Sequence, residues 1–363
     1  MHKVTRSAFL GPGWQALYSG RISPKKSAMG FEQIQWAQLI FLLSLGFALH
    51  AQEKPDSSKH TVQMVSVETG VSLEVLDWGG TGRPLILLAG LADDAHIFDQ
   101  FAPKLTVKYH VYGITRRGRG ASSSPAPEVK NYTANRLGED VLSVIAALHL
   151  QKPVIAGHSI AGEELSYIGS HHPEQVAGLI YLEAGYPYAL YDQAHGELEL
   201  DAIELRDQLR QFINGYALEP VKDYDDVIAN LERVEHEIKQ LEQNTKDLPP
   251  TPVSPRMTPE LFAIMEGRER FTTIHTPALV IMAGVEREKP DLITGDDPQS
   301  RAAAARQVLD MRRKEQPYPI FARQVPSAHV IRIPHATHYI FQSNEADVLR
   351  EMNTFIATLP LAN

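Results

Sequence analysis

The sequence predicts an α/β fold, a doubly wound and mostly parallel sheet with a helical insertion between two of its strands. Short apolar runs typical of buried strands alternate with amphipathic helical patterns between residues 84 and 184. The alternation stops after Tyr186, and strand patterning resumes only at residue 277. Alternating strands and helices imply right-handed crossovers, which bring helices onto both faces of one parallel sheet.

Composition limits the classes of function. The 363 residues are 43% hydrophobic, which is enough for one large core or two modest ones. The formal net charge of −9 argues against nucleic-acid binding, which needs a basic face. The chain has no cysteine, so disulfides, thiolate metal sites and cysteine nucleophiles are excluded. We expect neither a cofactor nor a bound metal.

The N-terminal region carries an apolar run at residues 36–49, which is shorter than the roughly 20 residues that span a bilayer. Basic residues precede the run, and Ala48 and Ala51 offer small side chains for cleavage. This pattern predicts a signal peptide within residues 1–51. We therefore expect an exported protein, periplasmic or secreted, with no stable membrane span after cleavage. The alternative is an uncleaved segment that anchors the protein to a membrane.

The elements of the core follow in order along the chain. Alternating polar and apolar residues around Gly70 predict a hairpin of two antiparallel strands over residues 62–78. Continuous apolar runs predict strands buried on both faces, and spacings of three and four predict the helices between them. The predicted strands are residues 84–90, 109–115, 153–159 and 176–184, and the predicted helices are residues 95–105, 135–150 and 160–172.

The insertion contains two helical patterns with one apolar stripe each, at residues 198–212 and 227–241. A third helix is predicted to begin after Thr258, which would be its N-cap, with Pro259 at the first helical position. We expect the apolar stripes to pack against the main domain. The alternative is that the helical hairpin forms the interface of a homodimer.

These patterns divide the chain into a leader, a core in two segments and a cap. After the insertion, the core continues with a strand, a helix, a second strand and a terminal helix. The predicted ranges are 277–284, 301–315, 329–334 and 345–359 for these four elements, 1–51 for the leader, 52–186 and 273–363 for the core, and 187–272 for the helical cap or lid.

The segment Gly157-His158-Ser159-Ile160-Ala161 links a buried strand to a helix. Strained backbone at such a corner would point the Ser159 hydroxyl out over the edge of the sheet, as at a nucleophile elbow. The residues two before and two after the serine then crowd together and must be small, as Gly157 and Ala161 are. The strand–turn–helix context favours a nucleophile over an ordinary turn serine.

With this corner in place, the chain resembles the α/β-hydrolase superfamily over nearly all of residues 62–360. Ala89 stands where the family often has histidine, and Thr115 stands where its Asp-x-Arg-Gly-x-Gly-x-Ser turn begins with aspartate. The segments that carry the resemblance are residues 87–105, 114–123, 157–161 and 333–356.

The resemblance implies the partners of Ser159. His338 would be the base, because it follows the last predicted strand and precedes the final helix; His335 is the alternative. Zinc on the Pro-His-Ala-Thr-His segment is disfavoured by Pro334 and the strand context. The acid would be Glu183, which directly follows a buried strand, with Glu286 as the second candidate.

The usual aspartate position near Glu286 is taken by Arg287. The resemblance also implies that the backbone N–H groups of Leu91 and Ile160 form the oxyanion hole. His158 points the opposite way from Ser159, so we expect a structural or pocket-lining role for it.

The resemblance implies a serine hydrolase that cleaves a small carboxylic ester, thioester or lactone through an acyl-enzyme, with a small molecule as substrate. Two alternatives remain open. One is a non-catalytic ligand-binding protein of the same fold, and the other is a carbon–carbon or peptide-bond hydrolase with the same triad. Ser159 argues against haloalkane dehalogenase or epoxide hydrolase activity, because those members of the superfamily use aspartate at this position.

Overall fold

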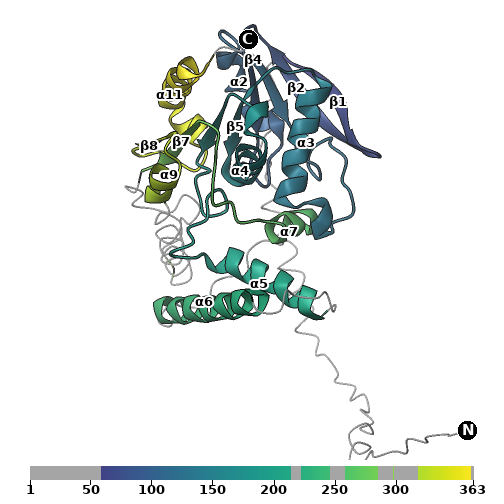
Figure 1. Cartoon of the computed structure of the whole chain (residues 1–363). Helices are drawn as coiled ribbons and strands as arrows, with labels where there is room; N and C mark the ends of the chain where they lie inside the picture. Colours follow the sequence, from purple (N-terminus) through teal and green to yellow (C-terminus); the bar gives the residue numbers. More distant parts are fainter. Residues whose placement is uncertain (1–58, 214–221, 246–257, 285–296, 298–317, 361–363) are drawn as a thin grey trace, which may run out of the picture. The chain divides into compact units, whose positions relative to one another are not determined.

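The computed structural model describes residues 59–213, 222–245, 258–284, 297 and 318–360. The predicted signal peptide, Glu286 and the predicted helix at residues 301–315 lie outside the described residues. Eight strands form one sheet in the order β1-β2-β4-β3-β5-β6-β7-β8 (Figure 1). The strands are β1 (Thr61–Glu68), β2 (Val71–Gly79), β3 (Pro84–Leu88), β4 (His110–Ile114), β5 (Val154–His158), β6 (Gly178–Leu182), β7 (Ala278–Ala283) and β8 (Ala328–Ile333).

The sheet is mixed but mostly parallel, as predicted. β1 pairs antiparallel with β2 around a turn at Gly70, whose φ of +81° suits glycine, and β2 pairs antiparallel with β4. Each remaining pair of neighbours is parallel.

Helices connect and flank the strands in the described part of the chain. The α helices are α2 (Ala102–Leu105), α3 (Ala134–Ala147), α4 (Gly162–His171), α5 (Leu198–Ile213), α6 (Lys222–Thr245), α7 (Pro259–Glu266), α9 (Tyr318–Gln324), α10 (Ile340–Ser343) and α11 (Glu345–Thr358). Short 3-10 turns are η1 (Ala95–Phe98), η2 (Val129–Asn131), η3 (Ser159–Ala161) and η4 (Pro173–Gln175).

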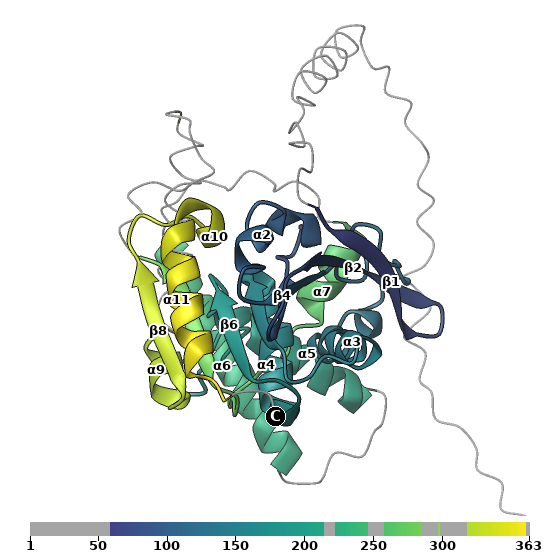
Figure 2. The same cartoon turned by 90° about the horizontal axis from the view of Figure 1, so that it is seen from above.

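Both faces of the central strands of the sheet are buried. Side chains alternate across a strand, so on β3 Ile86 and Leu88 join one apolar cluster while Leu85 and Leu87 join another. The first cluster includes residues of α3 and α4, and the second includes residues of α2 and α11. Figure 2 shows these two pairs of helices on opposite faces. The predicted doubly wound α/β fold is therefore confirmed.

The segment at residues 95–105 is not the single helix that its spacing predicted. It forms η1 and α2 with a break at Asp99–Phe101. The side chain of Asp94 caps η1 by accepting from the His96 N–H at 3.1 Å. Pro103 lies in the first turn of α2, where a missing backbone N–H is tolerated. In the interior of a longer helix, the same proline would remove a hydrogen bond and clash with the preceding turn, so η1 and α2 do not join into one helix.

The insertion between β6 and β7 contains α5, α6 and α7. The Thr258 hydroxyl accepts from the Leu261 N–H, and Pro259 begins α7, so the predicted helix start is confirmed. The domain limits themselves remain a prediction.

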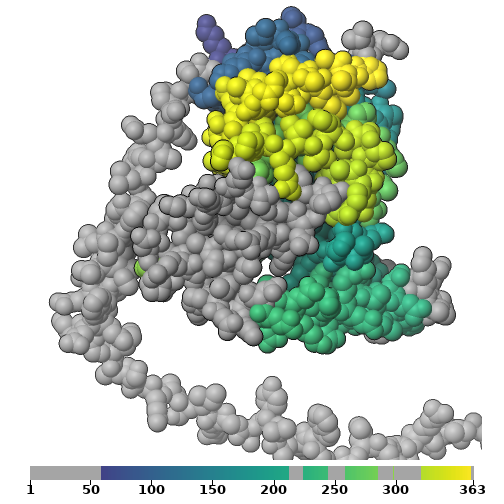
Figure 3. All heavy atoms as spheres, turned by 90° about the vertical axis from the view of Figure 1, so that its left-hand side faces the viewer, coloured from purple at the N-terminus to yellow at the C-terminus, as the bar shows by residue number. Residues whose placement is uncertain are grey.

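The apolar stripe of α6 does not pack as expected, because Leu231, Ile238 and Leu241 are 38–52% exposed. Two other members of the stripe, Val227 and Val234, are half-buried on the side of the helix where the buried Asn230 donates to Gln208 of α5 at 2.9 Å. The green segment that contains α6 lies at the surface in Figure 3.

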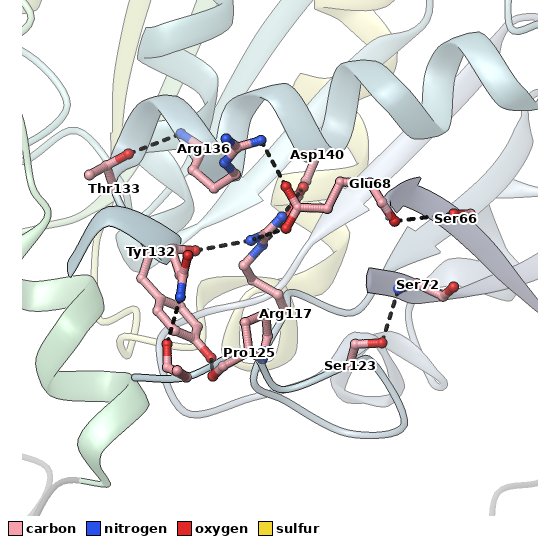
Figure 4. A network of polar contacts seen from close by, with 12 residues as sticks. Ser66, Glu68, Ser72, Arg117, Ser123, Pro125, Tyr132, Thr133, Arg136 and Asp140 are labelled. Carbon is pink, nitrogen blue, oxygen red and sulfur yellow. Dashed lines mark hydrogen bonds and ion pairs between the residues drawn. The ribbon is translucent and has the colours of Figure 1, made fainter. Parts of the chain in front are cut away.

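The turn after β4 is built around a buried arginine, Arg117. Its Nε and Nη2 donate to the two carboxylate oxygens of Asp140 at 2.6 Å, and its Nη1 donates to the Asn131 carbonyl at 3.2 Å (Figure 4). At the position where the family has aspartate, Thr115 donates to Glu74 of β2 at 2.7 Å. A carboxylate is therefore still present at this turn, but it comes from a neighbouring strand.

Candidate functional site

The corner between β5 and α4 has the geometry that its sequence predicts. Ser159 has a φ of +54°, a left-handed conformation that is strained for a residue with a side chain. A Cβ added at Gly157 would lie 3.0 Å from the Cβ of Ala161 and 3.1 Å from the side chain of Leu165. A Cβ at Gly162 would lie 2.5 Å from the Ala184 carbonyl oxygen. Only small residues fit around the serine.

His338 lies beside this serine. It follows β8 and precedes α10, and its Nε2 is 3.0 Å from the Ser159 Oγ. The two residues are 179 positions apart in the chain. The alternative base, His335, lies in the turn after β8 with an exposed side chain and a φ of +55°. The geometry therefore brings His338, rather than His335, to hydrogen-bond distance of the predicted nucleophile.

His158, the residue before the serine, supports the segment that carries His338. Its Nε2–H donates to the His338 carbonyl oxygen at 2.9 Å, and the two rings lie 4.7 Å apart. Its side chain is buried, and burial, together with the neighbouring His338, lowers the pKa of His158 to about 3. The imidazole is therefore neutral near pH 7, and the structural role expected from the sequence agrees with these contacts.

A second contact joins the His338 segment to the loop after β3. The Tyr339 hydroxyl donates to the carboxylate of Asp93, at 3.3 Å to Oδ2 and 3.5 Å to Oδ1. Burial raises the pKa of this aspartate above its ordinary value. Since Asp93 is two residues from Leu91, the contact connects the histidine segment to the loop that would supply an oxyanion donor.

Leu91 and Ile160 both lie just beyond the carboxyl ends of neighbouring parallel strands. Leu88 of β3 is the register partner of Gly157 of β5, and each strand is followed within three residues by a predicted donor. The Leu91 side chain packs against the small apolar cluster that includes Ile160. The structure thus places the Leu91 side chain against the cluster that contains Ile160, the residue after Ser159, and the assignment of the two N–H groups as oxyanion donors stays a prediction.

Glu183, the predicted acid, is the first residue after β6, the strand next to β5. It is buried and has a φ of +48°, so two adjacent strands end in strained polar residues. Its Oε2 accepts from the Ala283 N–H at 2.6 Å, and its Oε1 accepts from the Tyr186 hydroxyl at 2.8 Å. Ala283 is the last residue of β7, and Glu286 lies three positions later, outside the described residues. The assignment of the acid stays a prediction.

The sequence patterns did not point to two polar residues near Ser159, which are Tyr188 and Glu163. Burial and the nearby charge of Glu163 raise the pKa of Tyr188 well above its ordinary value, while a hydrogen bond with Ser159 acts in the opposite direction. Glu163, four residues after the serine at the start of α4, is completely buried, and neither carboxylate oxygen has a hydrogen-bond partner in the described part of the chain. Burial raises its pKa well above the ordinary value.

Adjacent acidic residues at a helix start ordinarily suggest exposure to solvent and interaction with the helix dipole. The sequence around Glu163 and Glu164 carries no signal that these two carboxyl groups are buried.

The described residues contain no group of three or more histidine, aspartate or glutamate side chains that could hold a metal ion. No helix in the same part of the chain is long and apolar enough to cross a membrane.

Comparison with known proteins finds similarity to the alpha/beta hydrolase fold. A family model described as the alpha/beta hydrolase fold matches residues 83–229. A fluoroacetate dehalogenase from a Burkholderia species is 29% identical over 117 residues, which cover 32% of this chain and 38% of that protein. The AB hydrolase superfamily protein YisY of Bacillus subtilis is 31% identical over 140 residues, which cover 36% of this chain and 51% of YisY.

The matched region spans about half or less of these curated relatives. Among solved structures, epoxide hydrolase A from Mycobacterium thermoresistibile aligns with 84% of this chain and 100% of its own, with a TM-score of 0.52 and 19% identity. At this identity, the structural match supports the fold alone.

Proposed function

We propose that this chain, which belongs to the α/β-hydrolase superfamily, is a serine hydrolase that cleaves a small carboxylic ester, thioester or lactone. The observation that carries the proposal is the 3.0 Å contact between the Ser159 Oγ and the His338 Nε2 at a strained strand–helix corner. A serine hydroxyl is a weak nucleophile near pH 7 and needs such a neighbouring base.

In the proposed reaction, the Ser159 Oγ attacks the substrate carbonyl carbon while His338 Nε2 takes the hydroxyl proton. The carbonyl oxygen becomes an oxyanion that accepts from the Leu91 and Ile160 N–H groups. Collapse of this intermediate breaks the bond to the leaving group, which receives the proton from His338. Water then attacks the acyl-enzyme with His338 again as base, and the carboxylic acid is released. Glu183 or Glu286 would orient the imidazole.

The relatives named for dehalogenase and epoxide hydrolase activity share the fold but do not determine the chemistry of this chain. Ser159 contributes a hydroxyl at the corner, and a hydroxyl forms an acyl ester with a carbonyl carbon. A carboxylate nucleophile, by contrast, forms an alkyl ester with a saturated carbon. The serine therefore favours acyl transfer over dehalogenation or epoxide opening.

Labelling with a fluorophosphonate probe tests this proposal on the full chain. We expect labelling of the wild type, none of Ser159→Ala, and a loss of at least a hundredfold in labelling rate for His338→Gln. His335→Gln is the matched control and should label like the wild type. Folded wild-type protein that resists the probe, or binds esters without turnover, would favour the ligand-binding alternative and refute the proposal.

We also propose that residues 1–51 direct export and are removed, because the apolar run at residues 36–49 has the length and flanks of a signal peptide. N-terminal sequencing of the protein recovered from the exported fraction tests this. An intact N-terminus in a membrane fraction would support the anchor instead.

A further inference from the structure

Arg116 makes three contacts that link the loop after β3 to the helix after Ser159. Its Nη2 donates to the Ala89 carbonyl oxygen and its Nη1 to the Gly90 carbonyl oxygen, both at 3.0 Å. Its Nε donates to the Glu164 Oε1 at 2.6 Å. Arg116 and Glu164 are both buried, with 7% and 3% of their surface exposed. The guanidinium is therefore shared between a loop and a helix that come from distant parts of the chain.

The contact with Gly90 has a consequence for the next residue. The Gly90 carbonyl and the Leu91 N–H belong to the same peptide unit, which is planar and trans. In a trans peptide, these two groups point in opposite directions. Holding the carbonyl on Arg116 therefore holds the Leu91 N–H pointing away from Arg116. A positive donor on the carbonyl also polarises the peptide, which makes its N–H a stronger donor.

Gly90 lies close to two polar side chains. A Cβ at this position would lie 3.0 Å from the Nδ1 of His158 and 3.2 Å from the Oδ2 of Asp93. A side chain here would therefore have to displace His158 or Asp93 slightly, whereas glycine avoids this but gives the peptide on either side more conformational freedom. The two hydrogen bonds from Arg116 supply the restraint that the missing side chain cannot.

Glu164 fixes the arginine in turn. It lies in the first turn of α4, five residues after Ser159, so the guanidinium is held relative to the helix that begins at the nucleophile. A hydrogen bond between charged partners is short and strong, and the planar fork of arginine can serve the carboxylate and two carbonyls at once. A lysine ammonium could not reach all three acceptors with the same geometry.

We propose that Arg116, held by Glu164, is a positioning residue that orients the Gly90–Leu91 peptide and thereby completes the oxyanion hole. The proposal rests on the proposed serine hydrolase function. Arg116 touches no reacting atom; it acts through the backbone of residues 89–91. The neighbouring Arg117 makes an equally buried ion pair with Asp140 and has no described contact with this loop, so it provides a natural comparison.

The test compares Arg116→Met and Arg116→Lys with the control Arg117→Met, using kcat, KM and two inhibitors that share one carbon skeleton. A trifluoromethyl ketone forms a tetrahedral adduct with the serine and needs the oxyanion hole, whereas the corresponding secondary alcohol binds without forming an oxyanion. Circular dichroism and thermal unfolding establish that each variant is folded. Wild-type protein that does not respond to the ketone would refute the proposed function itself.

For Arg116→Met, we expect kcat to fall by about 10²–10³-fold, the usual effect of losing one oxyanion donor, with KM changed by less than about threefold. The affinity for the trifluoromethyl ketone should fall by a similar factor, and the affinity for the alcohol should not. Arg116→Lys should lie between this variant and the wild type. Arg117→Met should lower thermal stability but keep the kcat of the folded protein.

Wild-type kcat and ketone affinity in folded Arg116→Met would overturn the proposal, as would an equal loss in Arg117→Met. If Arg116→Met does not fold, Glu164→Gln decides the question, since it keeps an oxygen acceptor and the side-chain shape but removes the charge. We expect a loss of about tenfold in kcat and in ketone affinity for Glu164→Gln. Unchanged values in that variant would refute the inference.

Discussion

Replacing His158 with glutamine should change how the stability of the protein depends on pH. The folded-state pKa of His158 is about 3, whereas an unfolded histidine titrates near 6.5. Below pH 6.5 the unfolded chain therefore takes up a proton that the folded chain does not, and the folded state loses stability as pH falls. Glutamine does not titrate, so the variant lacks this contribution.

The size of the effect follows from the two pKa values. Linkage gives a loss of about 2.5 kcal/mol from the wild-type free energy of unfolding between pH 7 and pH 4.5 through this one imidazole. At pH 7, the variant should be less stable than the wild type, because it loses ring contacts with His338, Tyr339 and Phe341 at 4.7–5.2 Å. The stability difference between the two proteins should therefore shrink by about 2.5 kcal/mol at the lower pH.

Urea unfolding at several pH values between 4.5 and 7.5 measures this difference directly. The matched control is His329→Gln, which removes an exposed imidazole from β8 and should follow the wild type. Parallel stability curves for the wild type and His158→Gln would refute the account of a buried neutral imidazole. Since the glutamine amide can still donate to the His338 carbonyl, His158→Leu should lose more ester-cleaving activity than His158→Gln.

Three further changes test the site. Gly157→Ala should cost about 1–3 kcal/mol of stability by overpacking against Ala161, and the displaced serine should lower kcat; unfolding and kinetics that match the wild type would contradict the steric argument. Glu163→Gln should gain stability relative to the wild type as pH rises above the pKa of an unfolded glutamate, because burial raises the pKa of the folded carboxyl and the unfolded chain therefore releases its proton first; a difference in melting temperature that does not change with pH would contradict this. If Glu183 is the acid of the triad, Glu183→Gln should lower kcat by about 10³–10⁴-fold. The same loss in Glu286→Gln, with little change in Glu183→Gln, would assign the acid to Glu286 instead.

The parts of the fold that depend on local pattern were predictable. Continuous apolar runs gave the buried strands, and Thr258-Pro259 gave the start of α7, because capping and burial leave short-range signals. The corner at Ser159 belongs in part to the same class, since the contact between Gly157 and Ala161 joins residues four positions apart, although Gly162 is also limited by the Ala184 carbonyl from a later strand end.

The hydrophobic periodicity of a helix does not predict what packs against its apolar side. The stripe on α6 was expected to face the core, yet Leu231 and Ile238 are half exposed. A 3.6-residue repeat identifies which side of a helix is apolar, but it does not identify a partner for that side.

The supporting contacts of the site depended on long-range geometry. Arg116 and Arg117 are both buried. Arg117 binds Asp140, whereas Arg116 binds Glu164 and the backbone carbonyls of residues 89 and 90. The sequence offers no means of telling these two roles apart. Tyr188 is a similar case, because its place near Ser159 depends on how the chain continues after β6.

The acyl-enzyme is the species on which the mechanism depends, and its detection is the most direct test. Mixing the wild type with excess p-nitrophenyl acetate and quenching in acid should leave one acetyl group on the peptide that contains Ser159, with a burst of about one nitrophenolate per protein. The His338→Gln variant should accumulate almost none on this timescale. An acyl group found on another residue, or turnover that survives in Ser159→Ala, would contradict the account.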